Sequence, residues 1–291
     1  MPIDAAKALA AEPRTGEISW NSKDVQLYHL GIGAGARPDT PDPVTDPDEL
    51  RYLLESRLQV LPSFATVAGA GSPGVISSLS MPGIEVDLAR VLHGGQSLVI
   101  HRPIPARGTA TATNRIAGVY DKGKAAVLVL RTEVADTEGP LWTNDSQIFI
   151  RGEGGWGGDR GPSARLDPPV GDPDRTVERP VRADQALLYR LSGDWNPLHA
   201  DPEFAKVAGF ERPILHGLCT YGITLKAVVD ALLGGDVTRV RSYATRFAGV
   251  VYPGETLRIR MWRTPRSTRV AVSAVERDDT PVLADTVVEH T

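Results

Sequence analysis

The sequence predicts an α+β protein built from two similar halves, each with a helix followed by antiparallel strands. Runs rich in β-branched residues occur in two groups of four, and Gly and Pro turns separate them. A segment with apolar residues at helical spacing precedes the second group. A short motif also occurs twice, because laying Tyr28 on Tyr189 aligns Leu30 with Leu191 at an offset of 161 residues.

A second match supports the same duplication. Residues 95–100 (Gly-Gln-Ser-Leu-Val-Ile) align with residues 254–259 (Gly-Glu-Thr-Leu-Arg-Ile) at an offset of 159. The two offsets agree within an ordinary insertion. We therefore expect an N-terminal half over residues 1–151, a linker over 152–179 and a C-terminal half over 180–291.

The first half is expected to begin with residues 1–20 as a helix-prone but loosely held arm. Residues 37–48, rich in Pro, Asp and Thr, predict an exposed loop, and residues 49–61 a short helix. Repeated Gly and Pro between residues 62 and 83 prevent an uninterrupted helix where the second half has its long one. The first half is thus expected to lack a central helix, which leaves space there.

The strands follow in the same order in both halves. Those of the first half are predicted at 97–101, 109–120, 125–135 and 141–151, and those of the second at 239–247, 256–263, 269–277 and 282–289. Residues 152–157 match G-x-G-x-x-G after a strand, but further Gly and Pro follow in place of a helix, so a linker is favoured over a dinucleotide site.

Two helices are predicted in the second half. Asp201 is a helix N-cap with Pro202 at the first helical position, and this helix should run to about Gly209. A longer helix should begin near Gly217 and end at Gly234. Its apolar positions follow helical spacing: Leu218, Tyr221, Leu225, Val228, Val229 and Leu232.

Composition limits the class of protein. The 291 residues are 41% apolar, enough for a sizeable core, and a net charge of −4 gives no reason to expect nucleic acid or an anionic membrane as partner. The single Cys219 excludes an internal disulfide framework. No apolar run approaches 18 residues, so we expect a cytoplasmic protein with no membrane partner.

The candidate catalytic residues lie between the second copy of the repeat motif and the start of the long helix. Asp194 and His199 stand five positions apart on a segment that Gly193 and Pro197 keep from being regular helix. A carboxylate and an imidazole can divide proton transfer near neutral pH. Asn196 supplies an amide for the substrate or a water, and the backbone N–H of Gly217, at a helix start without a Cβ, can receive a substrate oxygen.

Each of these residues has a plainer interpretation. Taken alone, Asp194 fits a turn residue and His199 a surface histidine. His199 and Asp201 also spell the H-x-D of a non-haem iron site, although a cap explains Asp201 better. His216 is expected to be structural and Cys219 a small buried hydrophobe. Tyr189, Trp195 and Tyr221 are expected in the core.

The residues from Tyr189 to His199 (Tyr-Arg-Leu-Ser-Gly-Asp-Trp-Asn-Pro-Leu-His) and from Gly209 to Gly222 resemble the signature of the (R)-specific type 2 enoyl-CoA hydratases in the MaoC-like dehydratase family. The two-repeat form in peroxisomal multifunctional enzymes is the most similar, and the resemblance begins near residue 20. It implies a double hot-dog fold, in which each sheet curls around a helix. The altered central helix of the first half then implies room for long or bulky acyl chains.

The resemblance also implies roles for single residues. Three segments resemble parts of the two-repeat hydratases that bind coenzyme A thioesters: Val-Leu-His-Gly, Asp-Lys-Gly and the segment that begins Arg-Phe. The implied substrate-binding residues are His93, Gly94, Lys122, Trp195, Pro197, Leu198, Arg246 and Phe247. Judged from the sequence alone, Arg246 and Phe247 fit two ordinary neighbouring residues of a strand equally well.

The expected function is the reversible hydration of a trans-2-enoyl-CoA to a (3R)-3-hydroxyacyl-CoA, with a fatty or steroid side chain as the acyl group. Asp194 and His199 are expected to activate one water, so no metal or redox cofactor is expected. The expected partners are the acyl-CoA substrate and a second copy of the chain. Two alternatives stay open: a hot-dog thioesterase and a non-catalytic acyl-CoA-binding subunit.

Overall fold

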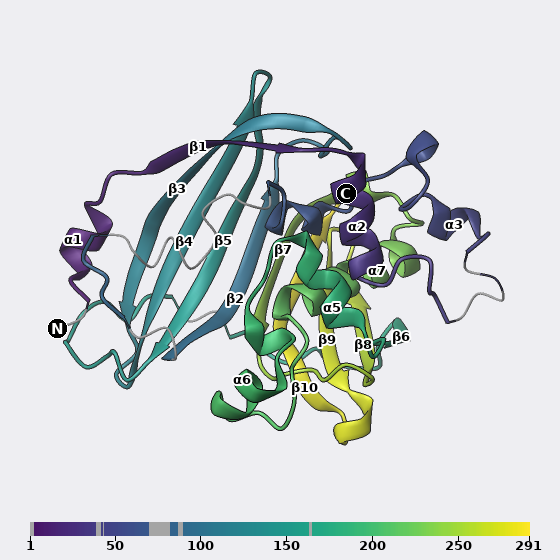
Figure 1. The fold of residues 1–291 in the computed structure, drawn as a ribbon. Coiled ribbons are helices and arrows are strands. Elements are labelled where there is room, and N and C mark those ends of the chain that lie inside the picture. Colours follow the sequence, from purple (N-terminus) through teal and green to yellow (C-terminus); the bar gives the residue numbers. More distant parts are fainter. Residues whose placement is uncertain (1–2, 39–41, 43, 70–81, 87–89, 163–164) are drawn as a thin grey trace.

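The described strands of the computed structural model form one ten-stranded antiparallel sheet (Figure 1). The model describes residues 3–38, 42, 44–69, 82–86, 90–162 and 165–291. The strand order across the sheet is β1-β3-β4-β5-β2-β7-β10-β9-β8-β6. The strands are β1 (Arg14–Trp20), β2 (Val91–Ile100), β3 (Gly108–Asp121), β4 (Ala125–Asp136), β5 (Gly139–Arg151), β6 (Arg175–Pro180), β7 (Val240–Phe247), β8 (Thr256–Arg263), β9 (Ser267–Ala274) and β10 (Thr280–His290).

From one edge to the centre the strand order is β1-β3-β4-β5-β2, and from the other edge it is β6-β8-β9-β10-β7. The two halves of the sheet therefore have the same topology, which indicates a duplicated unit. Strands β1 to β5 correspond in order to β6 to β10, and the two halves meet where β2 pairs with β7. This pairing runs from Gly95 opposite Arg246 to Val99 opposite Ser242. The predicted α+β class with two helix-and-sheet repeats is therefore confirmed.

All eight predicted strands are present, but two further strands were missed. Residues 14–20 form β1, which pairs with β3, so the predicted loose arm was wrong there; Ile18 and Trp20 are buried. Residues 175–180 form β6, which pairs with β8, so the predicted linker reaches too far. Both are edge strands with mostly exposed side chains, and their sequences lack the apolar alternation that predicts a strand.

The sheet also tests the two repeat matches. Tyr28 and Tyr189 follow equivalent strands, in α2 (Ser22–Gly31) and α5 (Gln185–Tyr189), and both are fully buried with ring centroids 6.1 Å apart. The second match was wrong, because residues 95–100 lie in β2 whereas residues 254–259 lead into β8. The sheet order makes β7 the counterpart of β2, so that similarity reflects only a turn that enters a strand.

The long helix α7 (Gly217–Leu232) lies at the centre of the core, as predicted. Every residue from Cys219 to Val229 is buried, and the helix packs against β6, β7, β8 and the 3₁₀ helix η2 (Pro62–Thr66). A helix that is enclosed on all sides needs apolar residues around its whole circumference. The same core cluster contains Tyr28 and Leu98 from the first half, so the two halves share one core.

The other helices are short. They are α1 (Ala5–Leu9), α3 (Pro47–Leu50), α6 (Pro202–Val207) and the 3₁₀ helices η1 (Glu55–Arg57), η4 (Arg190–Ser192), η5 (Pro197–His199), η6 (Val237–Arg239) and η7 (Val275–Arg277). The helix predicted over 49–61 is only α3 followed by η1. Residues 62–69 contain η2 and no α-helix, while residues 70–81 of the predicted interrupted segment lie outside the described residues.

A buried ion cluster joins the first half to α7. The Lys226 ammonium lies 2.6 Å from a carboxylate oxygen of Glu49 and 2.8 Å from one of Asp230. The Tyr52 hydroxyl donates to the second oxygen of Asp230 (2.8 Å), and the Gly35 N–H donates to Glu49 (2.7 Å). Since Glu49 is fully buried and Lys226 and Asp230 nearly so, each charge depends on its partners.

The buried His29 is expected to make the stability of the fold depend on pH. It is fully buried, its Nδ1 donates to the Tyr52 carbonyl (2.7 Å), and its Nε2 accepts from the Leu61 N–H (3.2 Å). Burial lowers the pKa of His29 to about 4, whereas an imidazole in the unfolded chain titrates near about 6.5. The folded state therefore binds fewer protons, and stability is complete above pH ~6.5 and falls as the pH drops toward 4.

The expected loss from His29 is about 1.4 kcal/mol per pH unit within this window. Urea unfolding at a series of pH values between 7 and 4.5 measures it. An unfolding free energy that stays constant over this range would contradict the prediction.

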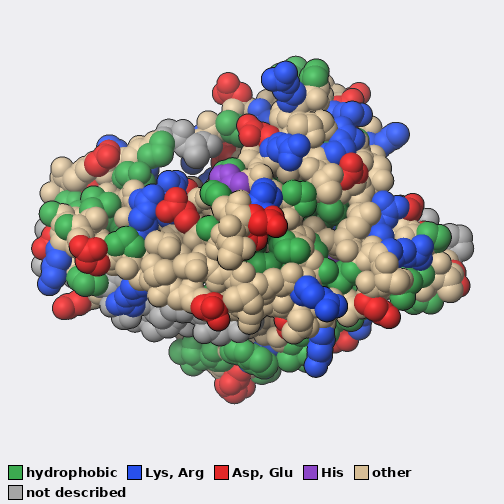
Figure 2. Space-filling model, turned by 90° about the horizontal axis from the view of Figure 1, so that it is seen from above, with side chains coloured by type: hydrophobic (Ala, Val, Ile, Leu, Met, Phe, Trp, Pro, Cys, Tyr) green, Lys and Arg blue, Asp and Glu red, His purple; other side chains and the backbone are tan. Residues whose placement is uncertain are grey.

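Acidic and basic side chains are interspersed over the face shown in Figure 2, as a net charge of only −4 leads one to expect. Across the described residues, no helix combines the length and the apolar character needed to span a bilayer.

Candidate active site

The catalytic segment is a series of tight turns between α5 and α6. Gly193 adopts a left-handed conformation (φ 116°) that ends η4 and turns the chain at Asp194. Asn196 then caps η5, because its side-chain oxygen accepts from the Leu198 N–H (3.0 Å). His199 is the last residue of η5, so this single short turn carries the imidazole back toward the carboxylate.

The structure brings Asp194 and His199 together with a third residue, His216. Each of the three offers a carboxylate oxygen or ring nitrogen, and these atoms all lie within 4.8 Å of one another. Asp194 is half-buried, whereas both histidines are buried. The carboxylate and imidazole predicted from the sequence therefore face the same small volume.

The hydrogen bond of His199 determines which of its nitrogens is available. Nδ1 lies 2.8 Å from the carbonyl oxygen of Ile214, and since a carbonyl only accepts, Nδ1 carries the proton. Burial lowers the pKa of His199, although the Ile214 carbonyl and the Asp194 charge act in the opposite direction. A neutral His199 leaves the lone pair of Nε2 free to accept a proton from a water.

His216 was expected to be structural, and its contacts reach both catalytic residues. Its Nε2 donates to the backbone carbonyl of Asp194 (3.2 Å), and its ring stacks on that of His199 with centroids 3.8 Å apart and an interplanar angle of 29°. Burial, followed by the proximity of His199, lowers the pKa of His216 to about 3. His216 thus ties the catalytic segment to the start of α7. Its position directly before Gly217 was the only sequence signal for this role.

Gly217 is the first residue of α7. The first N–H groups of a helix have no acceptor within the helix and lie at the positive end of its dipole. A Cβ at this position would lie 3.0 Å from Cε1 of Phe247, so any other residue would push against that ring. The helix tip therefore presents a backbone donor beside the Phe247 ring, which covers the side of Gly217 where a Cβ would stand.

The first half also reaches this site, through His93. Its ring packs edge-on against that of Phe247, with centroids 4.8 Å apart. Burial lowers the pKa of His93 to about 4, and the charge of Asp194 counteracts part of this shift. Phe247 thus lies between His93 of the first half and Gly217 of the second.

The other predicted binding residues differ in their surroundings. Arg246 is exposed, and its Nε donates to Asp285 (2.7 Å). On η5, Pro197 is exposed and Leu198 is half-buried. The Lys122 ammonium donates to the carbonyls of Arg160 and Pro162, in the segment after β5.

Among the aromatic residues, Tyr189 and Tyr221 are fully buried as expected. Trp195 in the core was a wrong prediction: it is 57% exposed, and the Arg190 guanidinium lies 4.8 Å from its ring centroid. Cys219 is buried as expected, and burial raises the pKa of its thiol.

Asp201 acts as the cap that the sequence predicts. Its carboxylate accepts from the N–H groups of Glu203 (2.9 Å) and Phe204 (3.3 Å) at the start of α6. This contact accounts for Asp201 without an iron ion.

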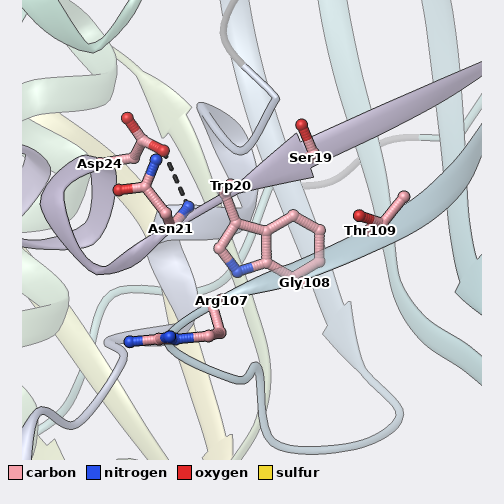
Figure 3. A pocket seen from close by; sticks show the side chains of 7 residues that line it. All are labelled: Ser19, Trp20, Asn21, Asp24, Arg107, Gly108 and Thr109. Atoms are coloured by element: carbon pink, nitrogen blue, oxygen red, sulfur yellow. Dashed lines mark hydrogen bonds between the residues drawn. The ribbon is translucent and has the colours of Figure 1, made fainter.

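Two cavities in the described structure contain none of Asp194, His199 and Gly217. One, of about 450 Å³, lies where β1 runs into α2 and is lined by Ser19, Trp20, Asn21, Asp24, Arg107, Gly108 and Thr109 (Figure 3). Asp24 is already used there, since it accepts from the Asn21 N–H (2.8 Å). The other, of about 90 Å³, is lined in part by Gly33, Pro38 and Lys226.

Comparisons with known proteins show the family of the chain. Residues 18–152 match the family model described as the MFE-2 hydratase 2 N-terminal domain, and residues 166–282 match the MaoC like domain. The chain is 49% identical over 285 residues to the enoyl-CoA hydratase ChsH3 of Mycobacterium tuberculosis (strain ATCC 25618 / H37Rv), with 98% of each chain covered.

Solved structures share the fold. A MaoC-like dehydratase from Phytophthora capsici superimposes with a TM-score of 0.87 at 30% identity, which covers 99% of this chain and 98% of that chain. A conserved hypothetical protein of Mycobacterium tuberculosis, described as having a double hot-dog fold, superimposes with a TM-score of 0.58 at 14% identity over 96% of this chain and 94% of the other. The predicted double hot-dog fold is therefore confirmed.

Proposed function

The chain belongs to the MaoC-like dehydratase family, in its two-repeat hydratase 2 form, and on this premise we propose that it catalyses the reversible hydration of a trans-2-enoyl-CoA to a (3R)-3-hydroxyacyl-CoA. The observation that carries the proposal is the convergence of Asp194 and His199 within 4.8 Å, in contact with the residue that precedes the helix tip. Conjugate addition of water needs a proton acceptor and an oxyanion donor together. These residues supply both.

In the proposed reaction, one water is held between the Asp194 carboxylate and Nε2 of His199. The thioester carbonyl accepts from the Gly217 N–H at the tip of α7. The water oxygen bonds to C3 as one of its protons passes to the Asp194–His199 pair, and negative charge develops on the thioester oxygen. The pair then returns a proton to C2, so that H and OH have been added across the double bond.

The typical contributions of an oxyanion donor and of an acid–base pair support this division of roles. An oxyanion donor contributes about 3–4 kcal/mol, and general acid–base action contributes roughly 10²–10⁴-fold in rate. The side-chain oxygen of Asn196 is occupied by its cap, so its NH₂ group is the part that can donate to the water or to the substrate.

The acyl group is proposed to be larger than a four-carbon chain. Residues 62–69 contain only the 3₁₀ helix η2, whereas the second half has part of its long helix at the corresponding positions. A medium or long fatty chain and a steroid side chain both suit such a substrate. The residues proposed to contact the thioester and coenzyme A are His93, Gly94, Lys122, Trp195, Pro197, Leu198, Arg246 and Phe247.

The proposed chemistry involves no metal and no redox cofactor. The cytoplasmic location also stays a prediction, as do the boundaries of the two halves and the linker, apart from residues 175–179, which belong to β6.

A homodimer is expected, because hot-dog sheets commonly pair, although β2 and β7 already pair the two halves of one chain. Light scattering after size exclusion should give twice the chain mass of 31.2 kDa. A mass equal to that of one chain would contradict this expectation.

A turnover assay over enoyl-CoAs of graded acyl size, with the configuration of the product determined, tests the function. Loss of the enoyl absorbance with formation of the (3R) alcohol is the expected result. Release of free coenzyme A would select the thioesterase alternative instead. Tight binding without turnover would select the non-catalytic acyl-CoA-binding subunit.

A further inference from the structure

Strand β2 contains a bulge directly after His93. His93 pairs with Ile148 and Gly95 with Gln147, so Gly94 has no residue opposite it on β5. Residues three apart on a regular strand point to opposite faces, and one extra residue reverses that alternation. The bulge therefore brings His93 and Gln96 to the same face, where Nε2 of His93 lies 3.1 Å from Oε1 of Gln96.

The two glycines permit this bulge. A Cβ at Gly94 would lie 3.3 Å from the Gln147 carbonyl oxygen and 3.3 Å from Cβ of Phe149. A Cβ at Gly95 would lie 3.0 Å from the Thr245 carbonyl oxygen on β7. A side chain at either position would press on β5 or β7, so the two glycines ease the fit of the bulge at the seam of the two halves.

A chain of buried amides continues from Gln96 into the first half. Gln96 is 2% exposed and Asn144 is 8% exposed. The Gln96 Nε2 group donates to Oδ1 of Asn144 (3.3 Å), and Nδ2 of Asn144 donates to the backbone carbonyl of Ala65 in η2 (2.8 Å). Ser146 donates to Oε1 of Gln96 (2.9 Å).

The Ala65 carbonyl at the end of this chain determines which group donates in each of its hydrogen bonds. The Ala65 carbonyl only accepts, so Asn144 must turn its NH₂ group toward η2 and its oxygen toward Gln96. Gln96 must then donate to Asn144, which leaves its oxygen for His93. The Gln96 oxygen thus faces Nε2 of His93 as an acceptor, and this chain of bonds assigns the ring proton to Nε2.

The other end of the chain reaches the catalytic site. His93 packs on Phe247, whose ring lies over Gly217. The charge of Asp194 is close enough to influence the pKa of His93.

We propose that Gln96 and Asn144 are positioning residues of the catalytic site, which hold His93 in one orientation and one tautomer and, through Phe247, hold the wall beside the helix tip. The inference rests on the proposed hydratase function. It gives a part in catalysis to the first half, which has Gly33 and Pro38 at the positions that the 161-residue offset aligns with Asp194 and His199.

Gln96→Met tests this role, since it removes both hydrogen-bonding groups at nearly constant side-chain length. Misplacement of catalytic groups by about 1 Å costs up to 10²-fold in rate, so kcat for enoyl-CoA hydration should fall about tenfold or more. KM should rise as well, because His93 and Phe247 are among the residues proposed to contact the substrate. Asn144→Leu should act in the same direction.

Thr268→Val is the matched control. Thr268 is fully buried on β9 and its hydroxyl bonds to Nε2 of His290 (3.1 Å). His290 pairs with Val240, at the opposite end of β7 from Phe247. This variant loses a buried hydrogen bond of the same kind away from the site, and its kcat should stay within about twofold of the wild type.

Nitrogen NMR of the histidine rings in full-length protein gives a readout that is independent of turnover. The wild type should show His93, assigned by comparison with a His93→Phe variant, as the neutral Nε2–H tautomer. Gln96→Met should show a mixture of tautomers. If Gln96→Met does not fold, Gln96→Glu keeps the shape and should raise the pKa of His93 above about 4, by pairing it with a carboxylate.

Wild-type kcat in Gln96→Met, or an equal loss in Thr268→Val, would overturn the proposal, as would an Nδ1–H tautomer of His93 in the wild type. A wild type that does not hydrate enoyl-CoA would instead overturn the proposed function, while the tautomer measurement would still test the hydrogen-bonded chain.

Discussion

Asp194→Asn and His199→Gln are each expected to lower kcat for enoyl-CoA hydration by about 10²–10⁴-fold. Asparagine keeps the size of Asp194 and an oxygen that can accept from the Asn196 N–H (3.2 Å), but it cannot take a proton from water. Glutamine at position 199 likewise removes the ring nitrogen that accepts a proton. Both variants should fold, because neither leaves a buried charge unpaired.

Initial-rate kinetics with a trans-2-enoyl-CoA, together with thermal unfolding, measures both effects. Asp201→Asn is the matched control: it makes the same Asp-to-Asn change nearby, and Asn caps a helix about as well as Asp. Its turnover should equal that of the wild type. Near-normal turnover in Asp194→Asn or His199→Gln would refute the catalytic assignment, and inactivity of Asp201→Asn would revive a role for His199 with Asp201.

Lys226→Met should destabilise the fold by about 3–5 kcal/mol, because it leaves Glu49 and Asp230 as buried carboxylates without their cation. A loss of this size is a large fraction of the stability of a typical domain. The loss should be concentrated on the contact between α3 and α7, which joins the two halves. Denaturant unfolding at pH 7 measures it.

Lys206→Met removes a lysine from an exposed pair with Glu203 and is the control. Both side chains of that pair are mostly exposed, so the change should cost less than about 1 kcal/mol. Equal unfolding free energies for Lys226→Met and the wild type would show that the buried cluster contributes no net stability.

Local patterns in the sequence were enough to predict the eight inner strands, the N-cap at Asp201 and the ends of α7. Each of these depends on residues close together in the chain. The pair Asp194 and His199 was also predictable, because Gly193 and a single capped turn bring the two side chains together locally.

The sequence determined the duplication, the family signature and the residues that carry acid–base chemistry, since all of these are encoded over short stretches. Only the tertiary structure decided that β1 and β6 are edge strands, that β2 corresponds to β7, and that His216 contacts both catalytic residues. It also decided that Trp195 is exposed and that Gln96 holds His93. These features arise from strand pairing and from side chains that meet across long separations, and hydrophobic periodicity carries no information about such partners.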